Sequence, residues 1–111
     1  MTDAQKLRLQ SMTGMHKNVT FKHKGGGGHR IMGRVVGEVH VMVNDYKHVL
    51  QKIEFADDIS WDGSTHAYRT GYWTYDAGKK RIVWGQYTQF LTETEYKVLL
   101  SQARKEEWDI F

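Results

Sequence analysis

Residues 29–43 impose the strongest constraint on the fold, because apolar and polar positions alternate along them over a length typical of a long extended strand. Asn44 and Asp45 follow, and both residue types tolerate the left-handed backbone of a tight turn. We therefore expect a hairpin that leads into another strand at 49–55. Even-numbered residues such as Glu38 face one way on the long strand. The opposite, apolar face carries Ile31, Gly33, Val35, Gly37, Val39, Val41 and Val43.

Three more segments have the composition of strands. Residues 18–23 contain β-branched and aromatic side chains, and the four glycines at 25–28 predict a flexible loop after them. Residues 67–75 and 80–90 are predicted to form a second hairpin around a loop at 76–79, where Gly78 fits a positive φ. This register places Trp73 opposite Ile82 and Gly71 opposite Trp84.

Residues 92–108 are predicted to form a helix. Thr92 and Glu95 have the spacing of a capping box, and apolar residues follow at helical intervals. The resulting apolar stripe consists of Tyr96, Leu99, Leu100 and Ala103. Residues 1–17 show no clear period, and we expect a short helix or a loose arm there.

Together these segments predict an α+β fold in a single domain over residues 1–111. It consists of a curved antiparallel β-meander of about five strands, at 18–90, packed against one C-terminal helix. Gly33 and Gly37 would allow the sheet to bend into a partial barrel. The predicted core contains Ile31, Val35, Val39, Val41, Val49, Ile53, Phe55, Ile82, Tyr96, Leu99, Leu100 and Trp108.

Composition narrows the environment and the partners. The chain has no cysteine, so we expect a reducing, cytoplasmic location, and its apolar runs are too short for a membrane helix. Residues 1–56 carry nine Lys or Arg against four acids, whereas residues 57–111 carry seven against nine. A basic half attracts polyanions, which favours nucleic acid or an anionic metabolite as a partner. No cofactor is expected.

Cations and aromatic residues supply the candidate binding site. The glycine loop between Lys22 and Arg30 could direct N–H groups at an anion, although it lacks the spacing of nucleotide-binding loops, and a solvated hairpin tip is the alternative. Farther along, nine aromatic residues lie between positions 61 and 96, where exposed rings would stack on bases. Core packing or a dimer face is the alternative for these rings. The residues assigned to nucleic acid are Lys22, Lys24, Arg30, Arg34, Arg69, Lys79, Lys80 and Arg81 for phosphates, and Tyr72, Trp73 and Trp84 for stacking.

Three functional hypotheses follow. The first is a small non-catalytic module that binds single-stranded nucleic acid. The second is a small-ligand or protein-interaction domain, including a homodimer, that uses an apolar pocket or a face of the curved sheet. The third is an enzyme in which His40 and His48, with Glu38 near them, act as a general base or metal pair. Asp57, Asp58 and Asp62, with Glu54 upstream and His66 nearby, could supply oxygen ligands for a divalent cation, but their spacing fits no EF-hand, and turn and surface residues are the better explanation.

Overall fold

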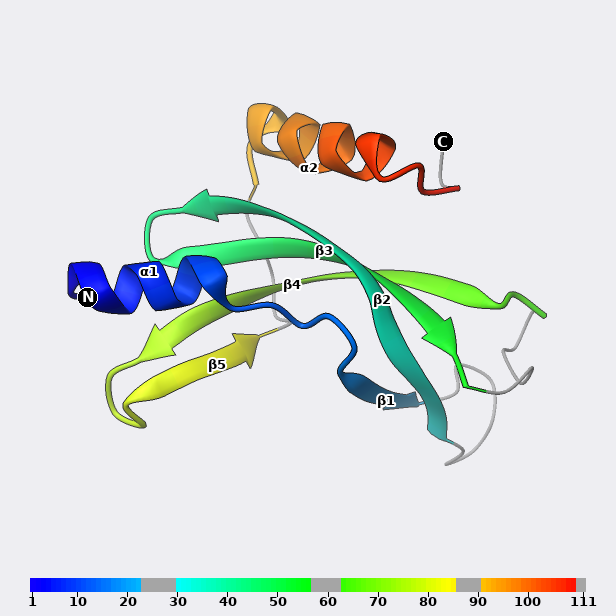
Figure 1. Cartoon of the computed structure of the whole chain (residues 1–111), viewed down its shortest axis with the longest axis horizontal. Helices are drawn as coiled ribbons and strands as arrows, with labels where there is room; N and C mark the ends of the chain where they lie inside the picture. The colour runs from blue at the N-terminus through cyan, green and yellow to red at the C-terminus, as the bar shows by residue number, and fades with distance from the viewer. Residues whose placement is uncertain (23–29, 57–62, 86–90, 110–111) are drawn as a thin grey trace. The chain divides into compact units, whose positions relative to one another are not determined.

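The computed structural model describes residues 1–22, 30–56, 63–85 and 91–109. The five strands form one sheet in the order in which they occur in the chain, and the α+β class with a curved antiparallel sheet and a C-terminal helix is confirmed (Figure 1). No helix in the described part is long and apolar enough to cross a bilayer. The elements are α1 (Asp3–Ser11), β1 (Asn18–Lys22), β2 (Arg30–Val43), β3 (Tyr46–Phe55), β4 (His66–Asp76), β5 (Arg81–Gly85) and α2 (Glu93–Lys105).

The chain forms two compact units. The first comprises Met1–Met12, Val39–Leu50 and Thr70–Phe111, and the second comprises Thr13–Glu38 and Gln51–Arg69. Strands β2, β3 and β4 contribute residues to both units. Among the predicted core residues, Val41 and Ile82 are half-buried. Those that are confirmed as buried are Val35, Val39, Val49, Ile53, Phe55, Leu99 and Trp108.

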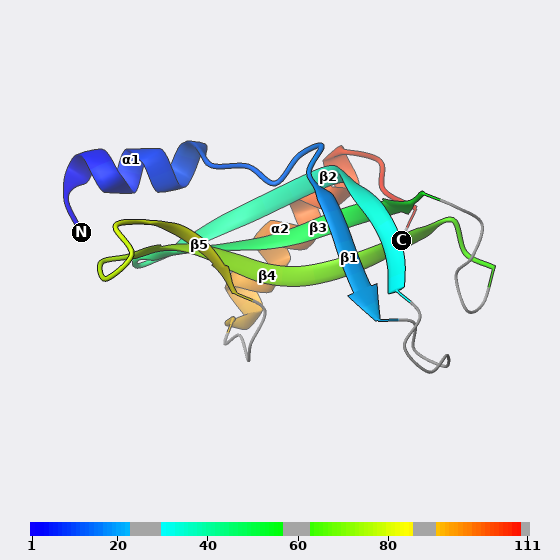
Figure 2. The same cartoon turned by 90° about the horizontal axis from the view of Figure 1, so that it is seen from below.

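In the first unit, α1 covers a face of β3 and β4 (Figure 2). A capping box at Thr2 begins this helix, so the N-terminal segment is a short helix. Leu9 is fully buried against Val49 and Trp73. The ammonium of Lys47, only 3% exposed, donates to the carbonyl oxygens of residues 10 and 12, where the end of a helix leaves acceptors unsatisfied.

The predicted capping box of Thr92 and Glu95 begins α2 and is confirmed. The core positions predicted for Tyr96 and Leu100 are wrong, since these side chains are 45% and 41% exposed. The buried side of α2 instead contains Leu99 and Ala103, next to half-buried Gln102.

Hydrogen bonds of Gln102 explain why the buried side of α2 includes Gln102 and leaves out Tyr96 and Leu100. Gln102 Oε1 accepts from the N–H of His40 at 3.0 Å, and Gln102 Nε2 donates to the carbonyl oxygen of His40 at 2.7 Å. These two bonds hold the Gln102 side of the helix against the edge of β2. Because β1 pairs with residues 30–34 of β2, the Gln102 amide takes the place of a neighbouring strand at His40.

The register of the β4–β5 hairpin differs from the prediction. Trp73 lies opposite Trp84, and Asp76 opposite Arg81, so the loop is 77–80. The positive φ, 53°, falls at Lys80. Asp76 stabilises the loop through its Oδ1, which accepts the N–H of Lys79 at 3.0 Å. The two tryptophans share a face as predicted. The register differs from the predicted one by two residues, and side chains two residues apart on a strand lie on the same face.

In the second unit, the long strand departs from strict alternation. A Cβ on Gly33 would lie 2.8 Å from Ile53 Cγ2, and Glu38 Oε2 accepts from Gln51 Nε2 at 2.7 Å. Since Gln51 and Ile53 are alternate buried residues of β3, Gly33 and Glu38 share a face although they are five residues apart. The predicted placement of Gly33 and Glu38 on opposite faces is therefore wrong. An extra residue in β2, as in a β-bulge, changes the face of the residues that follow it and accounts for this arrangement.

Candidate functional site

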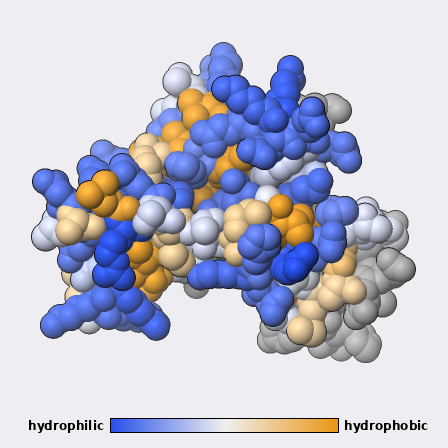
Figure 3. Space-filling view, in the orientation of Figure 1, coloured by the Kyte–Doolittle hydropathy of each residue, from blue (hydrophilic) through white to orange (hydrophobic). Residues whose placement is uncertain are grey.

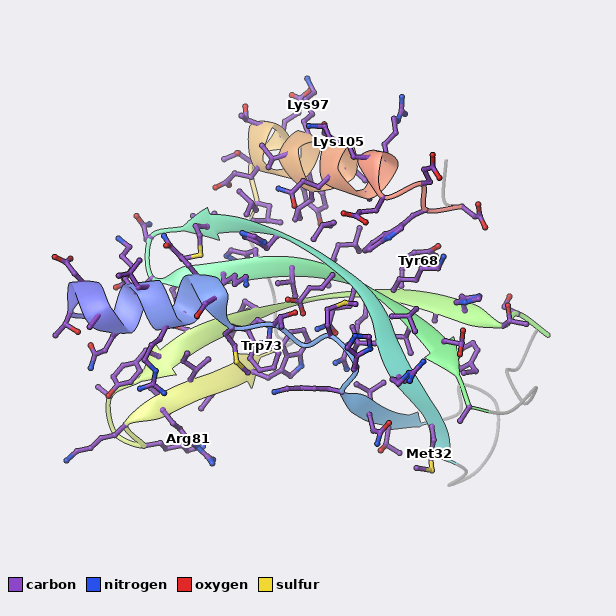
Figure 4. All side chains as sticks on the ribbon, in the orientation of Figure 1. Met32, Tyr68, Trp73, Arg81, Lys97 and Lys105 are labelled. Atoms are coloured by element: carbon purple, nitrogen blue, oxygen red, sulfur yellow. The ribbon has the colours of Figure 1, made fainter. Side chains whose placement is uncertain are left out.

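The structure places Trp73 in the core. Its side chain is only 7% exposed, and Leu9 of α1 packs against the same cluster. Trp84 is half-buried, with its ring centroid 4.8 Å from that of Trp73 and the two planes at 60°. The stacking role assigned to Trp73 therefore requires a ring face that the folded chain covers (Figure 4). Sequence reasoning missed this, because nothing local shows that α1 packs on β4.

A second aromatic group in the first unit is more accessible. Tyr46 is 44% exposed, and its ring lies 5.3 Å from Tyr72 in an edge-to-face arrangement and 6.1 Å from His48. Half-buried Tyr72 lies over Gly85, where a Cβ would come within 2.3 Å of Tyr72 Cζ. Tyr46 was absent from the predicted site. Its only local signal is its position directly after the Asn44–Asp45 turn.

Three of the predicted cations form a continuous exposed group at the end of the β4–β5 hairpin. Lys79, Lys80 and Arg81 are all exposed, and we name them the cationic tip. Figure 4 shows Arg81 extending away from β5, and the surface over this hairpin end is largely hydrophilic in Figure 3. Asp76, the acid next to the loop, accepts a backbone N–H from Lys79. The cationic tip is thus a small region of positive charge on an ordered turn.

A hollow of about 460 Å³ adjoins the cationic tip in the first unit. Lys80 belongs both to the tip and to the lining of the hollow. Thr74 donates through Oγ1 to the carbonyl oxygen of Asp45 at 2.9 Å, which ties β4 to the β2–β3 turn at this point. The volume lies within the usual range for small-molecule sites, about 300 to 1,000 Å³. The lining residues are Met1, Gln5, Asp45, Tyr46, Thr74, Tyr75, Ala77 and Lys80.

The remaining predicted cations belong to the second unit. Arg34 is exposed, and the β1–β2 register pairs it with Asn18 and pairs Lys22 with Arg30. Lys24 lies outside the described residues.

Arg69 belongs to a partly buried network of hydrogen bonds. Its Nε donates to Oε1 of fully buried Gln51 at 2.8 Å, and Gln51 in turn donates to Glu38. The N–H of Gly14 donates to the same Glu38 oxygen at 2.9 Å. Burial lowers the pKa of Arg69, and the negative charge of Glu38 opposes that shift. We therefore assign Arg69 to this polar network and leave it out of the phosphate-binding set.

The two histidines of the enzyme hypothesis lie in different surroundings. His40 is held through its backbone by Gln102, whereas His48 is buried beside Tyr46 and Tyr72. Glu54 and His66 approach to 3.6 Å, while residues 57–62 lie outside the described part. No group of three potential metal ligands occurs among the residues that the structure describes.

Compared with known proteins, the chain matches no family model, no curated protein and no solved structure.

Proposed function

We propose that this protein is a small binding module for single-stranded nucleic acid and that the cationic tip contacts the phosphates. The observation that supports this most is the exposure of Lys79, Lys80 and Arg81 at successive positions on one ordered turn. Phosphate contacts supply much of the affinity of sequence-independent nucleic-acid binding. The adjoining hollow, with Tyr46 and Tyr75 in its lining, provides aromatic surface beside that charge.

The charge of the tip determines how strongly the affinity should depend on salt concentration. For single strands, the logarithm of the affinity falls with the logarithm of the salt concentration with a slope of about −0.7 per neutralised phosphate. If each cation of the tip neutralises one phosphate, affinity drops about 18-fold between 50 and 200 mM salt. A protein that retains one of the three loses only about 3-fold over the same interval.

The experiment compares two double variants with the same change in charge. Lys80→Gln/Arg81→Gln removes two cations of the tip, and Lys97→Gln/Lys105→Gln removes two exposed lysines of α2 (Figure 4). Binding of a fluorescent oligonucleotide is measured by anisotropy at both salt concentrations. We expect the tip variant to bind more weakly with a shallower salt dependence, and the α2 variant to behave as the parent protein. Equal behaviour of the two variants, or no binding by the parent protein at 50 mM salt, contradicts the proposal.

A further inference from the structure

The hollow beside the cationic tip combines features that suit a flat, partly polar ring. Tyr46 and Tyr75 contribute aromatic surface, and Gln5, Asp45 and Thr74 contribute polar atoms. Gln5 Oε1 accepts the N–H of Thr2 at 2.8 Å, so the side chain is already ordered by the capping box of α1. The lining thus offers aromatic surface and polar atoms together, which are the two kinds of group that sites for small ligands use.

Tyr46 is the best placed residue to stack on such a ring. It packs against Tyr72 and His48 yet remains 44% exposed. A side chain that its neighbours already hold loses little further conformational freedom when a ligand stacks on it. The exposed part of Tyr46 therefore offers a pre-ordered aromatic surface.

Lys80 connects this surface to the phosphate-binding group. It lines the hollow and belongs to the cationic tip, so a base in the hollow and its own phosphate at the tip are compatible with one nucleotide. We infer that the hollow accepts one nucleobase of the bound strand, stacked on Tyr46. This inference rests on the proposed function, to which it adds the part of the nucleic acid that the site recognises.

The experiment separates recognition of a base from attraction to phosphate. The probes are a fluorescent oligonucleotide and an abasic strand of the same length, which carries the same number of phosphates. A base stacked on an aromatic side chain contributes enough free energy for about a 5- to 150-fold preference, so we expect the parent protein to bind the oligonucleotide more tightly by that factor.

Matched tyrosine variants locate the effect. Tyr46→Ala should lose the preference while still binding both strands, and Tyr46→Phe, which retains the ring, should keep it. Tyr96→Ala is the control, because Tyr96 is 45% exposed on α2 and outside the lining of the hollow. Thermal unfolding confirms that each variant is folded.

Each outcome has one meaning. Equal affinity of the parent protein for the two strands overturns the inference but leaves phosphate binding by the tip intact. A preference that persists in Tyr46→Ala also overturns it. Absence of binding to either strand at low salt overturns the proposed function itself.

Discussion

Replacing Leu9 by alanine tests how α1 is attached to the sheet. Leu9 is the buried residue of this helix, 0% exposed, and it packs against Val49 and Trp73. Truncation of a buried leucine costs about 2 to 5 kcal/mol, depending on how far the surroundings close the cavity. Because the rest of α1 buries little, the helix can detach, which limits the loss to the free energy that docks it. We therefore expect a decrease of about 2 to 3 kcal/mol in the free energy of unfolding.

Leu7→Ala is the matched control, because it is the same substitution in the same helix at a side chain that is 66% exposed. Its effect should remain within about 0.5 kcal/mol. Urea unfolding measures both variants, and acrylamide quenching of the tryptophan fluorescence, to which Trp73 contributes, should increase when α1 detaches. For Leu9→Ala the melting temperature should fall by about 10 °C. If Leu9→Ala is as mild as Leu7→Ala and quenching is unchanged, then α1 does not pack on Trp73.

Two further substitutions probe close contacts inside each unit. In Gly71→Ala the new Cβ would lie 2.1 Å from the Trp84 ring, so we expect a loss of about 1 to 3 kcal/mol and a change in tryptophan fluorescence, and an unchanged protein would exclude this packing. In Glu38→Ala the buried amide of Gln51 loses its acceptor, so urea unfolding should show a loss of about 2 to 4 kcal/mol in the free energy of unfolding. The control is Glu54→Ala at an exposed residue, which should change this free energy by less than about 0.5 kcal/mol. Equal effects of the two substitutions would contradict the polar network.

The parts of the fold that were predictable are those with local signals. The alternation over residues 29–43 and the turn at Asn44, whose φ is 53°, define the long hairpin. The capping box at Thr92 locates the start of α2 to the residue. In each case the determining interactions connect residues that are close in sequence, so the amino-acid pattern carries them.

Features that depend on distant segments were not predictable in this way. Leu7 and Leu9 lie on different sides of α1, so the helix has no apolar stripe to show that it covers Trp73. Which side of α2 is buried depends on the binding of Gln102 to the backbone of His40, and these two residues are 62 positions apart in the sequence. The hollow likewise combines α1, the β2–β3 turn and the β4–β5 hairpin, and no pattern in a single sequence brings these three segments together.

The pairing of Gln102 with His40 has a consequence for biosynthesis. Synthesis proceeds from the N-terminus, so β2 leaves the ribosome well before α2. During that interval the N–H and carbonyl of His40 lack the amide that later occupies them, and an open strand edge is a template for pairing with a second nascent polypeptide. Docking of α2 therefore covers a point on this strand edge that could otherwise pair with another polypeptide.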